Sequence, residues 1–311
     1  MQKITVKGTW LEMGRAAGQA QQYDIKSVFR KVKIPQSCSR LVSQQTNYLK
    51  QVAPQEFLYL QGMSEWSGQS LKFLIPLVSW EAFLSYGEHC STILGSNKDG
   101  WFIAHNEDDS ALLWKNRLWQ VRHMPKHGPW FEGIQYPGQL PGAAVGVNAQ
   151  GFAIAMNSLW RPGAKPDIGW PISFIGTRFL QSRSWKEVLQ TYRCVTANRG
   201  MHFFIVEKSH RAMSCEFFSD AKARQMIKPG FYHANHPLIT KLKNGAGQSL
   251  SSRIRMERLA KLDPHSLEEI TRCLRCSMKQ GGVKQVPSKQ DDTATLATFL
   301  VFPEKRKIEL I

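Results

Sequence analysis

The sequence has no long apolar run. A membrane-spanning helix needs about 18–20 consecutive apolar residues, whereas the best candidate, residues 73–80, is short, contains Pro76 and runs into Glu81. Residues 1–8 alternate apolar and polar side chains as a strand does, so the chain does not open on the apolar core of a signal peptide. We therefore expect no membrane span, no signal peptide and a cytoplasmic location.

Cysteine is also scarce, with six residues in a chain of 311. Without a signal peptide, we expect these cysteines to be reduced rather than paired. The single CxxC, Cys273 to Cys276, lacks the second pair of ligands that zinc needs and falls within residues 267–274, which have a helical pattern. A metal or redox role for this pair stays open as the minor alternative. We expect no cofactor and no metal.

Acidic residues are outnumbered: 24 Asp and Glu stand against 41 Lys and Arg, a formal net charge of +17. Such an excess favours a polyanionic partner, either nucleic acid, an anionic membrane surface or a phosphate-bearing ligand. Basic residues are dense between residues 222 and 261, near Phe217, Phe231 and Tyr232, but no nucleic-acid-binding signature accompanies them. A nucleic-acid or anionic-surface binding protein is therefore the alternative from a different functional class.

The chain contains no internal repeat, no low-complexity run and no linker rich in Pro, Gly or Ser, which predicts one domain over 1–311. Helical patterns come first, with a capping-box spacing from Thr9 to Glu12. Strand patterns and further helices follow Cys90, and grouping of this kind indicates an α+β fold. The predicted helices are 10–18, 56–63, 71–84, 174–192, 252–259 and 267–278, and the predicted strands are 91–95, 101–106, 143–147, 152–157, 202–207, 212–217, 295–302 and 307–311.

Cys90 carries the chemistry that the sequence suggests. It opens a predicted strand, and the hairpin through Asp99-Gly100 returns the acidic run Asn106-Glu107-Asp108-Asp109 towards it. A thiol nucleophile needs a base, which in one known solution is its own α-amino group, freed by cleavage of the preceding peptide bond. Its pKa, about 7.7–8.0, suits proton transfer near neutrality. A buried, inert cysteine at a strand start remains the alternative.

These residues also resemble a known family. Gly87 to Ile93, Asp99-Gly100 and Asn106-Glu107-Asp108 are similar to the cleavage region of the acyl-coenzyme A:6-aminopenicillanic acid acyltransferase family, the C45 peptidases. That family is related to the choloylglycine hydrolases and belongs to the N-terminal nucleophile hydrolases. Four further motifs resemble the family in the same order: residues 8–18, 148–157, 233–236 and 251–255.

The resemblance implies a fold and an activity. The fold is a four-layer αββα sandwich, and the precursor cleaves itself before Cys90 into 1–89 and 90–311. The activity is an N-terminal cysteine amidohydrolase acting on a linear, non-peptide amide, or alternatively an acyltransferase. The partner is then a small-molecule N-acyl amide or acyl thioester, and the sequence leaves homo-oligomerisation open.

The resemblance also assigns roles. Cys90 would be the nucleophile and its freed amine the base, Asp108 would hold that amine, and Asn235 would stabilise the oxyanion. Asn157 matches a second polar position near the acyl oxygen, and Arg253 matches an arginine that orients the nucleophile. Without catalysis, a strand-end position would explain Asp108 and Asn157, a turn position would explain Asn235, and a surface position would explain Arg253.

Three positions depart from the family pattern. His89 replaces glycine before the nucleophile, where self-cleavage needs a strained backbone that glycine adopts at least cost. Ser91 replaces threonine, and Glu107 replaces tryptophan between Asn106 and Asp108. The extra carboxylate either raises a neighbouring pKa or points to solvent. These departures leave slow or absent processing open, with an uncut, inactive member as a third alternative.

Overall fold

Two β-sheets form the centre of the molecule in a computed structural model that describes residues 1–79, 90–159, 167–208, 211–241 and 249–311. Neighbouring strands are antiparallel except for the parallel pair β1 and β4. The larger sheet has the order β1 (Gln2–Gly8), β4 (Trp119–Pro125), β5 (Phe131–Gln135), β6 (Val145–Asn148), β7 (Phe152–Ser158), β8 (Met201–Glu207), β9 (Arg211–Phe217) and β10 (Lys222–Ile227). The smaller has the order β11 (Tyr232–His233), β2 (Ser91–Asn97), β3 (Gly100–Ser110), β12 (Thr293–Phe302) and β13 (Lys307–Leu310).

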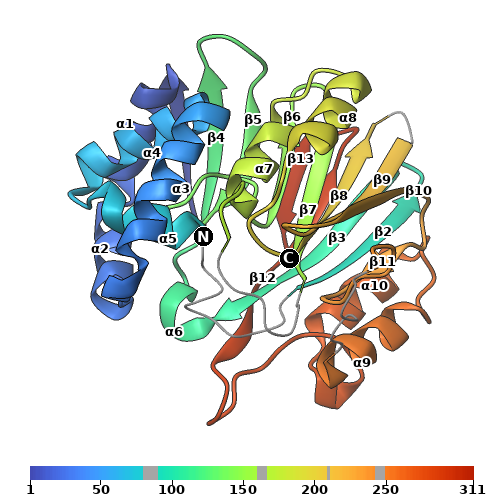
Figure 1. The fold of residues 1–311 in the computed structure, drawn as a ribbon. Coiled ribbons are helices and arrows are strands. Elements are labelled where there is room, and N and C mark those ends of the chain that lie inside the picture. The colour runs from blue at the N-terminus through green and yellow to red at the C-terminus, as the bar shows by residue number, and fades with distance from the viewer. Residues whose placement is uncertain (80–89, 160–166, 209–210, 242–248) are drawn as a thin grey trace.

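Helices cover the outer faces of both sheets (Figure 1). The helices are α1 (Trp10–Ala20), α2 (Gln22–Lys31), α3 (Ser39–Val52), α4 (Pro54–Ser67), α5 (Leu71–Ser79), α6 (Ala111–Trp114), α7 (Ile172–Leu180), α8 (Trp185–Cys194), α9 (Leu250–Leu259) and α10 (Leu267–Arg275). Helix α7 packs on β6, β7 and β8, whereas α10 packs on β2 and β3, and the inner faces of the sheets contact each other. The predicted α+β class and the αββα order of layers are confirmed.

The apolar strands explain why the sheets lie inside. Strand β8 is buried from Met201 to Val206, and β7 from Phe152 to Asn157, so both faces of these strands are covered. Continuous apolar runs of this kind are typical of a sheet with layers on both sides. No helix in the described ranges is long and apolar enough to cross a bilayer.

The glycine motif near the N-terminus allows two helices to touch. Thr9 and Glu12 form the predicted capping box at the start of α1. A Cβ at Gly14 would lie 2.0 Å from the carbonyl oxygen of Tyr59 in α4, and a Cβ at Gly62 would lie 2.2 Å from the carbonyl oxygen of Leu11. Only glycine permits this backbone contact, so this part of the motif serves packing.

Two element predictions were wrong. The single helix predicted over 174–192 is two helices, α7 and α8, because Ser184 caps a new helix by accepting a hydrogen bond from the backbone N–H of Glu187. The helix predicted over 267–278 ends at Arg275, and the chain then turns into a short 3₁₀ segment at Met278–Gln280. Residues 80–84 of the helix predicted over 71–84 lie outside the described residues.

Candidate active site

The hairpin of β2 and β3 brings the acidic run beside Cys90. A two-residue turn at Lys98 and Asp99 sets the register, which pairs Ser91 with Asn106. Cys90 is one residue beyond this pair and therefore comes opposite Glu107. Glu107 and Asp108 are only 2% and 1% exposed. Buried carboxylates are costly unless hydrogen-bonded, and their clustering here marks a candidate functional site.

Cys90 itself has an unusual backbone. Its φ angle is +84°, in the left-handed region that side chains other than glycine rarely adopt, which costs about 1–3 kcal/mol. Its backbone N donates to Asp108 Oδ2 at 3.3 Å, and its Sγ lies 3.7 Å from Glu107 Oε2. The strained residue is thus held by contacts to two carboxylates.

The pKa values in this cluster follow from burial. Burial raises the pKa of the Cys90 thiol well above its usual range, and the negative charges of Glu107 and Asp108 raise it further. Burial also raises the pKa of Asp108, while the nearby Arg255 cation and a hydrogen bond from Thr295 act in the opposite direction. The thiol therefore needs a base close by before it can act as a nucleophile.

Arg255 connects the cysteine to the predicted oxyanion residue. Its Nη1 donates to the carbonyl oxygen of Cys90 and, at 3.0 Å, to Ser91 Oγ. Its Nη2 donates to Asn235 Oδ1 at 2.7 Å, and the side chain is completely buried. Arg253, the arginine selected from the sequence, is exposed two residues earlier on α9. The structure does not bring Arg253 to the cluster and places Arg255 there instead.

The two asparagines join the same network. Asn235 donates from Nδ2 to the carbonyl oxygen of Ser158 at 2.8 Å. Asn157 donates from Nδ2 to the carbonyl oxygens of His233 and Ala234, at 3.0 and 3.1 Å, and both asparagines are fully buried. The structure therefore connects Cys90, Asp108, Asn235 and Asn157 in one buried region.

A second chain of contacts starts from Asn157. Its Oδ1 accepts a hydrogen bond from Thr92 Oγ1 at 2.7 Å, and Thr92 Oγ1 lies 2.8 Å from His105 Nδ1. His105 Nε2 lies 2.8 Å from Glu107 Oε2, and Tyr136 donates its hydroxyl to Glu107 Oε1. Burial lowers the pKa of His105 to about 3, so its ring is neutral near pH 7.

Sequence reasoning missed His105, Tyr136 and Arg255. It placed Glu107 in the acidic run near Cys90 and noted it as a departure from the family pattern, without assigning it a role. The signal for Glu107 and His105 was the hairpin register, since a two-residue turn at Lys98 and Asp99 pairs Thr92 with His105. Tyr136 reaches Glu107 from the segment after β5, a contact between distant parts of the sequence that no local pattern reveals.

Other sequence candidates lie elsewhere or outside the described residues. His89, and with it the geometry of the predicted cleavage bond, is outside the described ranges. Cys273 of the CxxC is inside α10 and Cys276 caps its end. Lys222 and Arg224 of the basic region are engaged at the end of α8, where Lys222 donates to the carbonyl oxygens of Tyr192, Arg193 and Val195.

The chain was compared with curated proteins and with solved structures. A search of curated proteins gives no significant match. The solved structures that resemble the fold include a conjugated bile acid hydrolase from Clostridium perfringens, at 13% identity and a TM-score of 0.45, covering 71% of this chain and 92% of that one. A penicillin V acylase from Agrobacterium tumefaciens matches at 12% identity and a TM-score of 0.42, covering 71% of this chain and 83% of that one.

The family itself is identified from the sequence. A family model described as acyl-coenzyme A:6-aminopenicillanic acid acyl-transferase matches residues 94–311, which is more than half of the chain. The match contains Asp108, Asn157 and Asn235 and begins four residues after Cys90. The chain belongs to the acyl-coenzyme A:6-aminopenicillanic acid acyl-transferase family.

Proposed function

We propose that the protein is an N-terminal cysteine amidohydrolase that cleaves a linear amide bond of an N-acyl substrate through a thioester on Cys90. The observation that carries the proposal is the contact of the Cys90 backbone N with Asp108 Oδ2, at 3.3 Å. A carboxylate in this position would hold the α-amino group once the bond before Cys90 is cut. The left-handed backbone of Cys90 supports the cleavage, because hydrolysis of that bond would release strain.

The reaction would proceed in two acyl-transfer steps. The Cys90 amine takes the proton of the thiol, Sγ attacks the amide carbonyl carbon, and the oxyanion forms. Asn235 donates one N–H to Ser158, so its second N–H is the donor that we assign to the oxyanion. Collapse breaks the C–N bond, the amine leaves with the proton, and water then hydrolyses the thioester.

Arg255 takes the positioning role that the sequence suggested for Arg253. Its guanidinium group fixes the carbonyl of Cys90 and the Oδ1 of Asn235 at the same time, which holds nucleophile and oxyanion donor in one frame. A planar, bidentate donor suits this bridge better than a lysine would.

The alternative in the same site is acyl transfer to an amine instead of water. An acyl-coenzyme A donor carries phosphates, which the net charge of +17 would attract. Product analysis with and without an amine acceptor separates the two: an amide product grows with acceptor concentration for a transferase, whereas free acid dominates for a hydrolase.

Nucleic-acid binding has weaker support. Lys222 and Arg224 contact α8, and Arg255 is buried beside Cys90, so these three members of the basic region serve the fold and the site. A binding protein would lose affinity steeply as salt rises, which a filter-binding titration with DNA and RNA would detect.

A panel of N-acyl amides and acyl thioesters tests the proposed function. The wild-type chain and Cys276→Ser should release acid from the same substrates, because Cys276 lies at the end of α10. Cys90→Ala should lose at least 10³-fold in kcat/KM, since the covalent step has no nucleophile. Equal activity of Cys90→Ala and wild type would disprove the catalytic assignment.

A further inference from the structure

His105 Nε2 and Glu107 Oε2 lie 2.8 Å apart, and if both atoms carry lone pairs, only a proton or a cation between them makes this contact favourable. The Nδ2 of Asn157 donates to two carbonyl oxygens, which fixes its Oδ1 as the acceptor towards Thr92. The Thr92 hydroxyl donates its one hydrogen to that Oδ1, so it accepts from His105 Nδ1–H. In the neutral ring, Nε2 then carries a lone pair, and it faces Glu107 Oε2 at 2.8 Å.

The thiol of Cys90 meets the same point. Among the described residues, Cys90 Sγ, His105 Nε2 and a Glu107 carboxylate oxygen form a group whose atoms all lie within 4.8 Å of one another, and all three residues are buried. Sulfur, imidazole nitrogen and carboxylate oxygen are the three donor types that zinc uses in proteins.

Two of the distances between these atoms can be compared with those around a tetrahedral zinc ion. Zinc bonds of about 2.0–2.3 Å place ligand atoms roughly 3.3–3.7 Å apart. The thiol sulfur lies 3.7 Å from Glu107 Oε2, within this range, and the His105 to Glu107 distance of 2.8 Å must widen by about half an ångström. Two neighbouring hydroxyl groups already orient the proposed ligands. The Thr92 hydroxyl accepts from His105 Nδ1–H, and the Tyr136 hydroxyl donates to Glu107 Oε1. Such contacts fix the orientation of metal ligands.

We propose that Cys90, His105 and Glu107 form a site for a zinc-like divalent cation, which blocks acyl transfer while it is bound. Binding forms bonds from the cation to Cys90 Sγ, His105 Nε2 and Glu107 Oε2, with the fourth position left to water. The thiol proton, and the proton shared by His105 and Glu107, pass to solvent. No electron is transferred. The lone pair of the Cys90 thiolate is then bound to the cation and cannot attack a carbonyl carbon. The site shares Cys90 with the proposed function, but binding does not require catalysis.

Cobalt substitution tests the site without any substrate. The full chain is treated with a chelator, desalted and titrated with Co²⁺, whose bond to a thiolate gives a strong near-ultraviolet absorption. We expect one Co²⁺ per chain, displaced by one Zn²⁺. Glu107→Gln and His105→Gln keep similar side-chain size and should weaken binding at least 100-fold, while Tyr136→Phe should weaken it about 10–100-fold.

Matched variants make the result decisive. Cys276→Ser removes another cysteine and should keep the full band, and circular dichroism confirms that each variant is folded. An absent band, or a band that survives both ligand variants, overturns the site. In an amide assay, saturating Zn²⁺ should lower activity at least tenfold, and a chelator should restore it. If the chain hydrolyses amides but binds no cation, the metal site is wrong and the proposed function stands. If it binds the cation but hydrolyses no amide even after the cation is removed, the metal site stands and the proposed function is wrong.

Discussion

Arg255 joins the residue at the start of β2 to the turn that carries Asn235. It is buried and donates to the carbonyl of Cys90, to Ser91 and to Asn235, whereas Arg253 is exposed. Arg255→Lys keeps the charge but cannot reach the Cys90 carbonyl and Asn235 Oδ1 at the same time. We expect it to lower kcat/KM by at least tenfold, with Arg253→Lys unchanged. Equal losses in the two variants, measured on one amide substrate, would contradict the positioning role.

His123 provides a pH-dependent contribution to stability. It is buried in β4, stacks on Phe131 with ring centroids 4.8 Å apart and contacts Tyr59, and burial lowers its pKa to about 3. The unfolded chain takes up a proton near pH 6.5, which the folded chain resists. The stabilisation is therefore complete above pH 6.5 and lost as the pH falls towards 3. At pH 5 the loss is about 2 kcal/mol.

Urea unfolding at pH 7.5 and pH 5.0 measures this term. We expect the difference between the two free energies of unfolding to shrink by about 2 kcal/mol in His123→Phe. His127, four residues later, is exposed, so His127→Phe should keep the wild-type difference. If His123→Phe retains the full difference, the proton uptake resides on other groups.

The sequence could predict that Cys90 and Asp108 lie close together, because the family resemblance and the expected β2–β3 hairpin both indicate it. It could not select Arg255 over Arg253. The two lie on different sides of a helix whose apolar residues do not mark one clear face. The choice is made by a contact between α9 and the start of β2, which are more than 150 residues apart in the chain.

The crossing of α1 and α4 leaves no room for a side chain at Gly14. A Cβ at Gly14 would overlap the carbonyl oxygen of Tyr59, so Gly14→Ala must push the helices apart. We expect a loss of about 2–3 kcal/mol in the free energy of unfolding, despite the better helix propensity of alanine. Gln19→Ala, an exposed change in the same helix, should alter stability by less than about 0.5 kcal/mol. Equal stability of Gly14→Ala and wild type would show that the helices separate freely.

The elements that could be predicted are those marked by a short sequence pattern. The capping box at Thr9, the hairpin of β2 and β3 and the hairpin of β12 and β13 all follow from short patterns. The parallel pairing of β1 with β4 did not, since it joins strands more than 100 residues apart. The break between α7 and α8 depends on one cap residue, Ser184, inside an otherwise helical pattern.

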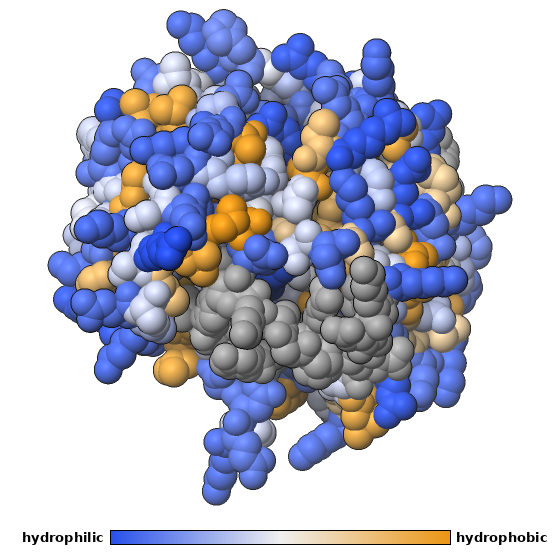
Figure 2. All heavy atoms as spheres, in the orientation of Figure 1, coloured by the Kyte–Doolittle hydropathy of each residue, from blue (hydrophilic) through white to orange (hydrophobic). Residues whose placement is uncertain are grey.

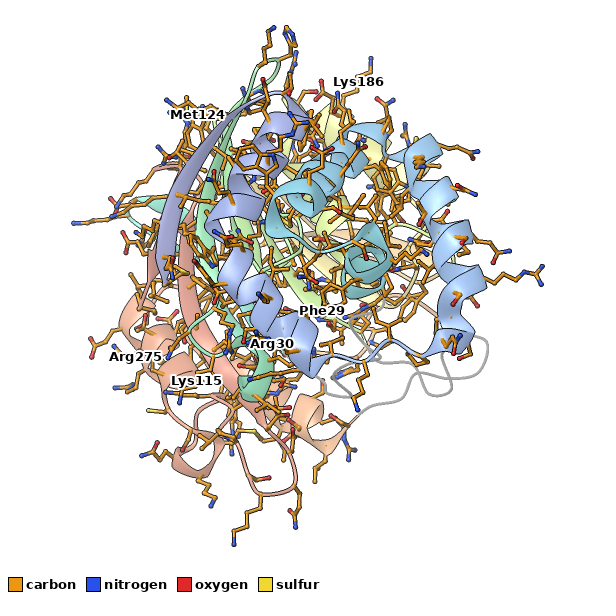
Figure 3. The ribbon with its side chains drawn as sticks, turned by 90° about the vertical axis from the view of Figure 1, so that its left-hand side faces the viewer. Phe29, Arg30, Lys115, Met124, Lys186 and Arg275 are labelled. Carbon is orange, nitrogen blue, oxygen red and sulfur yellow. The ribbon has the colours of Figure 1, made fainter. Side chains whose placement is uncertain are left out.

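Basic side chains project from several elements of the described structure. Figure 3 labels Arg30, Lys115, Lys186 and Arg275, which project from α2, the segment after α6, α8 and α10. On the face in Figure 2, hydrophilic residues cover most of the coloured surface, and hydrophobic residues form small separate groups. With a formal net charge of +17, like charges repel one another across the folded chain.

Salt should therefore stabilise the chain. Raising sodium chloride from 50 to 500 mM screens the repulsion, and we expect the thermal midpoint to rise by about 1–2 °C, equivalent to roughly 1 kcal/mol. Differential scanning calorimetry at fixed pH measures the shift. A falling midpoint would mean that attractive ion pairs outweigh the repulsion.

The central claim is that Cys90 becomes an N-terminal nucleophile, and intact-mass spectrometry of the purified full chain tests it most directly. After brief exposure to an activated acyl ester, we predict two fragments, residues 1–89 and 90–311, with the acyl mass on the second. Cys90→Ala should remain one chain without added mass. A wild-type chain that stays uncut, carries no acyl group and matches the Cys90→Ala mass pattern would contradict the account.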